Sequence, residues 1–87
     1  MNNLDELRKK IDGIDMGILE LLSNRIDIAK LIAQIKNENN LQVFQPEREK
    51  IIIETIKKRA IELGLPEKFV LDIYELILDQ SKKSQKI

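Results

Sequence analysis

The sequence predicts one all-α domain over residues 1–87, with three helices, one long and two shorter. Apolar residues recur at spacings of three and four along most of the chain, which is the period of an amphipathic helix, and no strand-like alternation interrupts them. The first periodic segment runs from about residue 3 to residue 38 without a proline, whereas Pro46 and Pro66 divide the remainder into two shorter segments. A chain of 87 residues buries an apolar core poorly alone, so a second copy is expected.

The first segment predicts a single helix of about 35 residues, which is about 50 Å long at a rise of 1.5 Å per residue. Its apolar stripe consists of Leu4, Leu7, Ile11, Ile14, Ile18, Leu21, Leu22, Ala29 and Ile32. Two shorter helices of the same chain cannot cover a stripe of this length. The long helix therefore predicts a partner chain.

The rest of the chain predicts a loop and two helices. The polar stretch NENNLQVFQ at 37–45 is typical of a loop, and Pro46 suits the first turn of a second helix. Gly64 is expected to end that helix, and Pro66 marks the start of a third helix that continues past Ser81. The apolar face of the second helix consists of Ile52, Ile53, Ile56, Ala60 and Leu63. That of the third helix consists of Phe69, Val70, Ile73, Tyr74, Ile77 and Leu78.

The composition excludes several classes of function. The chain has no cysteine and no histidine, so it lacks thiol nucleophiles, imidazole bases, disulfides and the usual zinc ligands. Lys and Arg total 15 and balance 15 Asp and Glu, so no net positive charge favours nucleic acid or an anionic membrane. No apolar run approaches the roughly 20 residues of a membrane span, and the N-terminus has no signal-peptide pattern. We expect a cytoplasmic protein without a metal, nucleic-acid or membrane partner.

Several polar side chains fall on the apolar faces of the predicted helices, although surface side chains normally lie opposite such faces. On a helical wheel, Arg25 and Lys36 lie about 20° apart near the middle of the first stripe. Glu49 falls inside the apolar arc of the second helix. Ser81 and Gln85 are four residues apart and share the apolar face of the third helix.

Two explanations fit this pattern. Each residue alone could form an ion pair inside a dimer, or lie near a helix end where a long side chain reaches water. Together, the five residues come from three helices and could meet in one polar pocket. Such a pocket suits a small anion, because Arg binds carboxylates bidentately and Lys supplies a point charge. We favour the pocket for the set.

Arg8 lies far from the other candidate cations along the first predicted helix. It lies at the edge of the first stripe and, taken alone, reads as a solvated surface cation. Along one straight helix Arg8 lies about 42 Å from Lys36, too far for one metabolite to contact both. An antiparallel second chain would bring its own Arg8 beside Arg25 and Lys36. The pattern alone leaves both interpretations of Arg8 open: a solvated surface cation, or a contribution to a site shared between two antiparallel chains.

Four segments, in this order and spacing, carry a resemblance to a known family: LRKKIDGID, LLSNRIDIAKLIAQIK, PERE and LILDQSKKSQ. The chain resembles the all-helical chorismate mutases over about residues 4 to 85. The resemblance implies an intertwined homodimeric helical bundle with two equivalent sites. It also implies an isomerase that carries out the intramolecular, Claisen-type rearrangement of chorismate to prephenate in phenylalanine and tyrosine biosynthesis. That reaction needs no cofactor or metal, so the absence of Cys and His is no obstacle.

The resemblance also implies roles for the residues that could bind the carboxylates and the ether oxygen of chorismate. Arg25 and the partner subunit's Arg8 would bind the two carboxylates. Lys36 would contact a carboxylate and the ether oxygen, and Gln85 would donate to the same ether oxygen. Ser81 would help to hold a carboxylate. Lys36 and Gln85 are therefore the expected catalytic residues.

The remaining implied roles concern the ring of the substrate. Glu49, with the backbone near Arg48, would bind the ring hydroxyl, and Ile32 and Leu78 would be apolar walls. Gln45 departs from the pattern, because some members of the family carry Asp at this position. An amide still forms hydrogen bonds, so Gln45 remains a predicted contact to the substrate.

Two other functions fit parts of the sequence. Isochorismate-pyruvate lyases share the implied fold and similar cations, but PERE favours the mutase, because Glu49 offers a partner for the ring hydroxyl. A non-catalytic helical dimerisation module is the alternative from another class, in which buried charges would fix the register of the helices. Such a module predicts no stabilisation by dicarboxylates.

Overall fold

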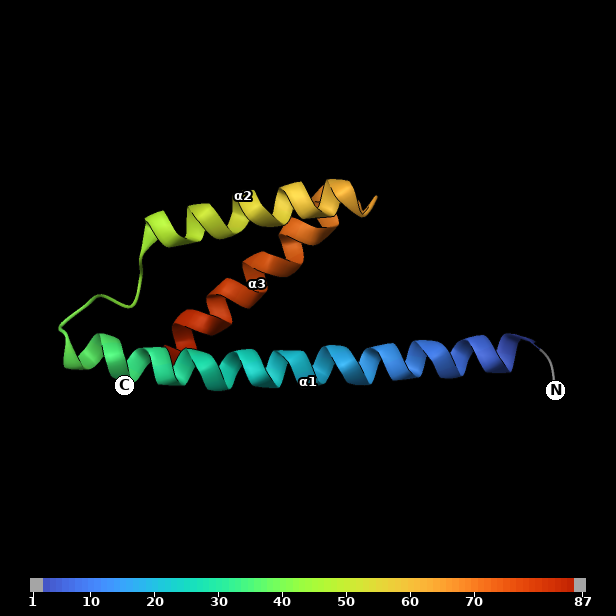
Figure 1. Ribbon diagram of the computed structural model, residues 1–87, viewed down its shortest axis with the longest axis horizontal. Helices are drawn as coiled ribbons and strands as arrows, with labels where there is room; N and C mark the ends of the chain where they lie inside the picture. Colours follow the sequence, from blue (N-terminus) through green and yellow to red (C-terminus); the bar gives the residue numbers. More distant parts are fainter. Residues whose placement is uncertain (1–2, 86–87) are drawn as a thin grey trace.

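The computed structural model describes residues 3–85, which form three α-helices: α1 (Asn3–Glu38), α2 (Pro46–Glu62) and α3 (Glu67–Gln85) (Figure 1). No strand occurs among these residues, so the predicted all-α class is confirmed, as is the order of one long and two shorter helices. The predicted loop begins at residue 39 rather than 37, because α1 continues through Glu38. None of the described helices combines the length and the apolarity that crossing a membrane requires.

A Schellman motif ends α1 and turns the chain back toward α2. The N–H of Leu41 donates to the carbonyl of Lys36 at 2.7 Å, and the N–H of Asn40 donates to the carbonyl of Asn37 at 3.3 Å. Asn40 takes the left-handed conformation that this motif needs, with φ of 57°, and Asn tolerates it better than most residues. The following residues therefore run back beside the last turn of α1.

The ends of α2 lie where the sequence predicts them. Pro46 occupies the first turn, where its missing N–H leaves no carbonyl unpaired. Gly64 follows the helix with φ of 70°, and the N–H of Leu65 donates to the carbonyl of Ala60 at 2.9 Å. This is a second Schellman motif, with glycine at the left-handed position. It brings the chain directly into α3.

Helix α3 crosses between the other two helices and packs against both (Figure 1). The buried apolar residues are Ala29, Ala33, Ala60, Val70 and Leu78. Because three of these five are alanines, the helix backbones approach closely where they cross. The packing holds α3 against the C-terminal half of α1 and against the end of α2.

The N-terminal part of α1 extends beyond the other two helices (Figure 1). Its apolar residues are more than half exposed, at 54% for Leu7, 57% for Ile11 and 62% for Ile14. The radius of gyration is 16.5 Å, whereas a compact chain of this length has about 12 Å. The accessible surface is 7283 Å², against about 5,300 Å² for a compact monomer of this mass. A single chain therefore leaves a long apolar stripe without cover.

The left-handed conformation at Gly64 gives a test of the second Schellman motif. We expect Gly64→Ala to lower the free energy of unfolding by about 1 kcal/mol, because a Cβ disfavours positive φ. No atom lies within 4 Å of the Cβ that alanine would add, so the loss comes from the backbone and not from a clash. Gly64→Asn is the control and should lose less. Urea unfolding at one fixed protein concentration measures both, and equal stability of Gly64→Ala and the parent would contradict this account.

Candidate active site

A half-enclosed cavity of about 380 Å³ lies where the C-terminal half of α1, the 39–45 connection, the start of α2 and the end of α3 meet. Pockets that hold small ligands have about 300–1,000 Å³. The apolar lining consists of Ile28, Ala29, Ile32, Val43, Ile52 and Leu78. The polar lining consists of Arg25, Lys36, Gln45, Arg48, Glu49, Ser81 and Gln85. The cavity therefore has one apolar wall and a group of cations and hydrogen-bonding side chains.

The cavity brings together predicted site residues from each part of the chain. The predicted residues that line it are Arg25, Ile32, Lys36, Gln45, Arg48, Glu49, Leu78, Ser81 and Gln85. Arg8 is the exception, because it lies exposed near the N-terminal end of α1, outside the cavity that one chain forms. The predicted pocket is present, and the contribution of Arg8 from a partner chain stays a prediction.

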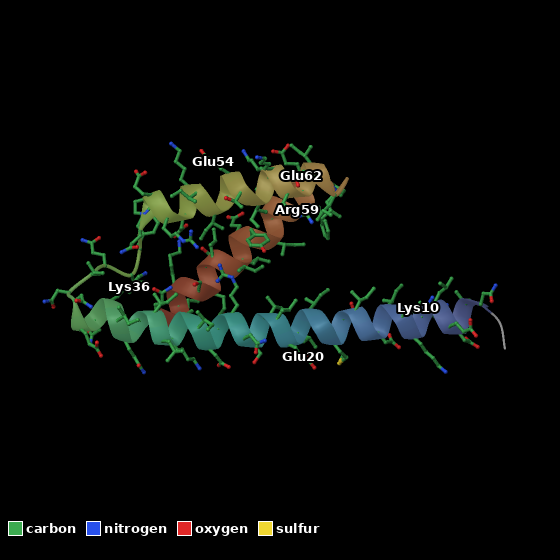
Figure 2. The ribbon with its side chains drawn as sticks, viewed as in Figure 1. Lys10, Glu20, Lys36, Glu54, Arg59 and Glu62 are labelled. Carbon is green, nitrogen blue, oxygen red and sulfur yellow. The ribbon has the colours of Figure 1, made fainter. Side chains whose placement is uncertain are left out.

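Lys36 lies in the last turn of α1, on the side that faces the connecting segment (Figure 2). Its ammonium donates to the carbonyl of Val43 at 2.9 Å and to Oε1 of Gln85 at 2.6 Å. The Schellman motif at Asn40 makes the first contact possible, because it returns the chain to the end of α1. Two acceptors from distant parts of the sequence thus hold one half-buried cation at the cavity.

Gln85 connects the end of α3 to this cation. Its side chain is buried, with 8% of the residue exposed. Nε2 donates to Oγ of Ser81 at 3.2 Å, one helical turn earlier. An ammonium has only hydrogens to offer, so the amide oxygen must face Lys36 and the amide nitrogen must face Ser81. The predicted pairing of Ser81 and Gln85 on one face of α3 is therefore confirmed.

Glu49 forms an ion pair that the sequence analysis missed. Nζ of Lys82 lies 3.3 Å from Oε2 of Glu49, and both side chains are mostly covered, with 30% and 25% exposed. Nζ of Lys82 also lies 4.9 Å from the centroid of the Phe44 ring and 3.8 Å from Oδ1 of Asp79. Lys82 follows a predicted site residue directly in the sequence. Its position next to Ser81 was the only feature of the sequence that pointed to Lys82. Its ion pair with Glu49 depends on how α3 crosses α2, which the sequence pattern does not predict.

Arg25 and Arg48 supply charge that no residue between 3 and 85 neutralises. Among the described residues, neither guanidinium has a hydrogen-bond or ion-pair partner. Arg25 is half-buried, whereas Arg48 is exposed at the start of α2. Three cations therefore line the cavity, and its one carboxylate, that of Glu49, is already paired. The electrostatics favour an anionic ligand with more than one charge.

The family model described as chorismate mutase type II matches residues 7–86. This chain belongs to that family. A chorismate mutase of Methanocaldococcus jannaschii is 38% identical over 86 residues, covering 99% of this chain and 87% of that protein. A 4-amino-4-deoxychorismate mutase of Streptomyces venezuelae is 29% identical and covers 91% of this chain and 77% of that protein. The solved structure of a conserved hypothetical protein from Pyrococcus furiosus is similar with a TM-score of 0.72, at 37% identity and 99% coverage of both chains.

The unneutralised cations of this family member give a test by ligand binding. We expect cis-1,3-cyclohexanedicarboxylate to raise the melting temperature by about 5 °C or more at saturation, because it binds only the folded chain. Arg25→Met should abolish most of this rise. Arg59→Met is the matched control, because Arg59 lies on the exposed surface of α2 and pairs with Glu62 at 3.0 Å. A dimerisation module without a binding site would show no rise in any of the three proteins.

Proposed function

We propose that this chain catalyses the rearrangement of chorismate to prephenate in the biosynthesis of phenylalanine and tyrosine, in the cytoplasm. The observation that carries the proposal is the presence of three cations on one cavity of a type II chorismate mutase family member. Chorismate is a dianion whose rearrangement is intramolecular, so it needs positioning and charge stabilisation rather than a nucleophile. A chain without Cys or His would be able to supply both.

Positioning is the first contribution that the site would make. Chorismate is flexible, and its two reacting ends must meet before the new bond forms. Arg25 and the partner subunit's Arg8 would each bind one carboxylate, with Ser81 as a further donor. Holding both carboxylates selects the compact conformer. It thereby lowers the entropic part of the activation free energy. Arg25 is suited to this role, because no described residue competes for its guanidinium.

Stabilisation of developing charge is the second contribution. As the C–O bond breaks, negative charge grows on the ether oxygen, and fixed donors there favour the transition state over the ground state. The Lys36 ammonium has three hydrogens, and Val43 and Gln85 accept two of them. The Gln85 amide has two hydrogens, and Ser81 accepts one. Each donor therefore keeps one hydrogen for the substrate without breaking the contacts that position it.

Recognition of the substrate ring is assigned to residues at the start of α2 and to the apolar wall of the cavity. Glu49 would accept a hydrogen bond from the ring hydroxyl, with the backbone near Arg48 as a second partner. Gln45 directly precedes α2 as its N-cap residue, and its side chain forms no cap hydrogen bond, so its amide is available to the ligand. Ile32 and Leu78 belong to the apolar wall and would pack against the ring.

A homodimer completes the proposed site. The uncovered stripe of α1 fits a second copy of the same helix, because an antiparallel pair would bury both stripes at once. The excess of accessible surface over a compact monomer, about 2,000 Å², is of the size that obligate dimers bury. Within one chain Arg8 lies about 42 Å from Lys36. Antiparallel packing is the arrangement that would bring the partner subunit's Arg8 to the cavity.

Direct assay of chorismate tests the proposed reaction. We expect the protein to consume chorismate and form prephenate, and Lys36→Met to lower kcat by about 10²–10³-fold, because a fixed donor to the ether oxygen is lost. Lys58→Met is the control, because Lys58 is exposed on α2 outside the cavity. Turnover that persists in Lys36→Met would contradict the role of Lys36. Release of pyruvate from isochorismate, without prephenate formation, would favour the lyase instead.

Sedimentation equilibrium tests the dimer. We expect a species of about twice the 10.1 kDa chain mass, with a melting temperature that rises with protein concentration. Ile11→Glu should shift the equilibrium toward monomer, because it places a charge on the exposed stripe of α1. Glu20→Gln is a control on the same helix, and Glu20 is exposed. A stable monomer at micromolar concentration would contradict the proposal of a shared site.

A further inference from the structure

Lys82 is a mostly covered cation that the proposed reaction does not use. It pairs with Glu49 at 3.3 Å, and its ammonium lies 4.9 Å from the centroid of the Phe44 ring. Asp79 is its second carboxylate neighbour at 3.8 Å, but 54% of that side chain is exposed, so water screens the contact. The cation is therefore held by α2, α3 and the connecting segment, directly behind the one carboxylate that lines the cavity.

The relatives of this chain include proteins named for two substrates that differ at one ring position. One is a chorismate mutase and another is a 4-amino-4-deoxychorismate mutase. By their chemical names, the second substrate has an amino group where the first has the 4-hydroxyl. An aliphatic amine is protonated at neutral pH, so the difference at this position is that between a neutral donor and a cation. Discrimination between the two substrates would therefore depend on the charges around Glu49.

We propose that Lys82 is a specificity-determining residue that makes the site select a 4-hydroxyl over a 4-ammonium group. This inference rests on the proposed function, in which Glu49 accepts a hydrogen bond from the ring hydroxyl. An unpaired Glu49 would attract an ammonium group more strongly than a hydroxyl. With Lys82 beside it, the repulsion between the two cations offsets that attraction, while a neutral hydroxyl still donates to the carboxylate.

The comparison of two substrates isolates this effect. Both substrates carry the same two carboxylates, so any general attraction of Lys82 for an anion acts on both and cancels in the ratio of their kcat/KM values. A displacement of Glu49 would weaken the contact with an ammonium group more than the contact with a hydroxyl, so it would shift the ratio toward chorismate, which is opposite to the direction expected here. What remains is the interaction of Lys82 with the group at the 4-position. For charges about 6 Å apart, that interaction corresponds to about threefold in the ratio in bulk water and about a hundredfold near a protein surface, and we take the intermediate value of about tenfold for this partly exposed site.

The test uses the full chain and both substrates, chorismate and 4-amino-4-deoxychorismate. Lys82→Met keeps an unbranched side chain and removes the charge that lies over the Phe44 ring. Lys82→Arg keeps the charge, and Lys58→Met removes a charge from the exposed surface of α2. We expect Lys82→Met to shift the kcat/KM ratio about tenfold toward the amino substrate, and we expect Lys82→Arg and Lys58→Met to keep the parent ratio. Circular dichroism checks that the three variants retain helicity.

The outcomes separate this inference from the proposed function. A parent protein that converts neither substrate overturns the proposed function, and the role of Lys82 with it. A parent that converts chorismate, together with an unchanged ratio in Lys82→Met, overturns only the role of Lys82. An equal loss on both substrates is such an unchanged ratio, since a purely structural role lowers both rates together. If Lys82→Met does not fold, Lys82→Gln replaces it, and the same ratio decides.

Discussion

The length of α1 is the constraint on which the rest of this structure depends. A helix of 36 residues is about 54 Å long, whereas α2 and α3 have 17 and 19 residues. Helix α3 packs only against the C-terminal part of α1, so most of the apolar stripe is left without cover (Figure 1). A second copy that buried this stripe would supply the missing core and would also deliver Arg8 to a distant cavity. Assembly and completion of the site would then follow from one packing event.

The C-terminal half of α1, which the other helices cover, places cations beside an apolar core. A buried charge is unfavourable without a partner. The Lys36 ammonium therefore has two acceptors, Val43 from the connection and Gln85 from the end of α3. Lys82 neutralises Glu49 in a similar way. Arg25 and Arg48 have no such partners among the described residues, and neither is fully buried. The unneutralised charge is thus concentrated where a dianion would bind.

The sequence was sufficient for the helices, because their boundaries depend on local chemistry. Pro46 and Gly64 marked the ends of α2, and periodicity marked α1 from residue 3 to residue 38. Residues that line the cavity were also predictable from the sequence. A helical wheel places Arg25 and Lys36 on one face of the first helix, and both line the cavity. The Lys36 contact with Val43 was not predictable, because it uses a backbone carbonyl that the turn at Asn40 brings back. The pair of Glu49 and Lys82 depends on the crossing of two helices, which no local pattern encodes.

The measurement that tests the shared, charged site most directly is the recovery of activity on mixing two inactive variants. Arg8→Ala and Lys36→Met would each inactivate every site in their own homodimers. After subunit exchange, half of the dimers are mixed, and each mixed dimer has one site with both native residues. We expect recovery to about a quarter of the parent chorismate mutase activity. No recovery, despite exchange demonstrated by mass spectrometry of differently tagged chains, would contradict it.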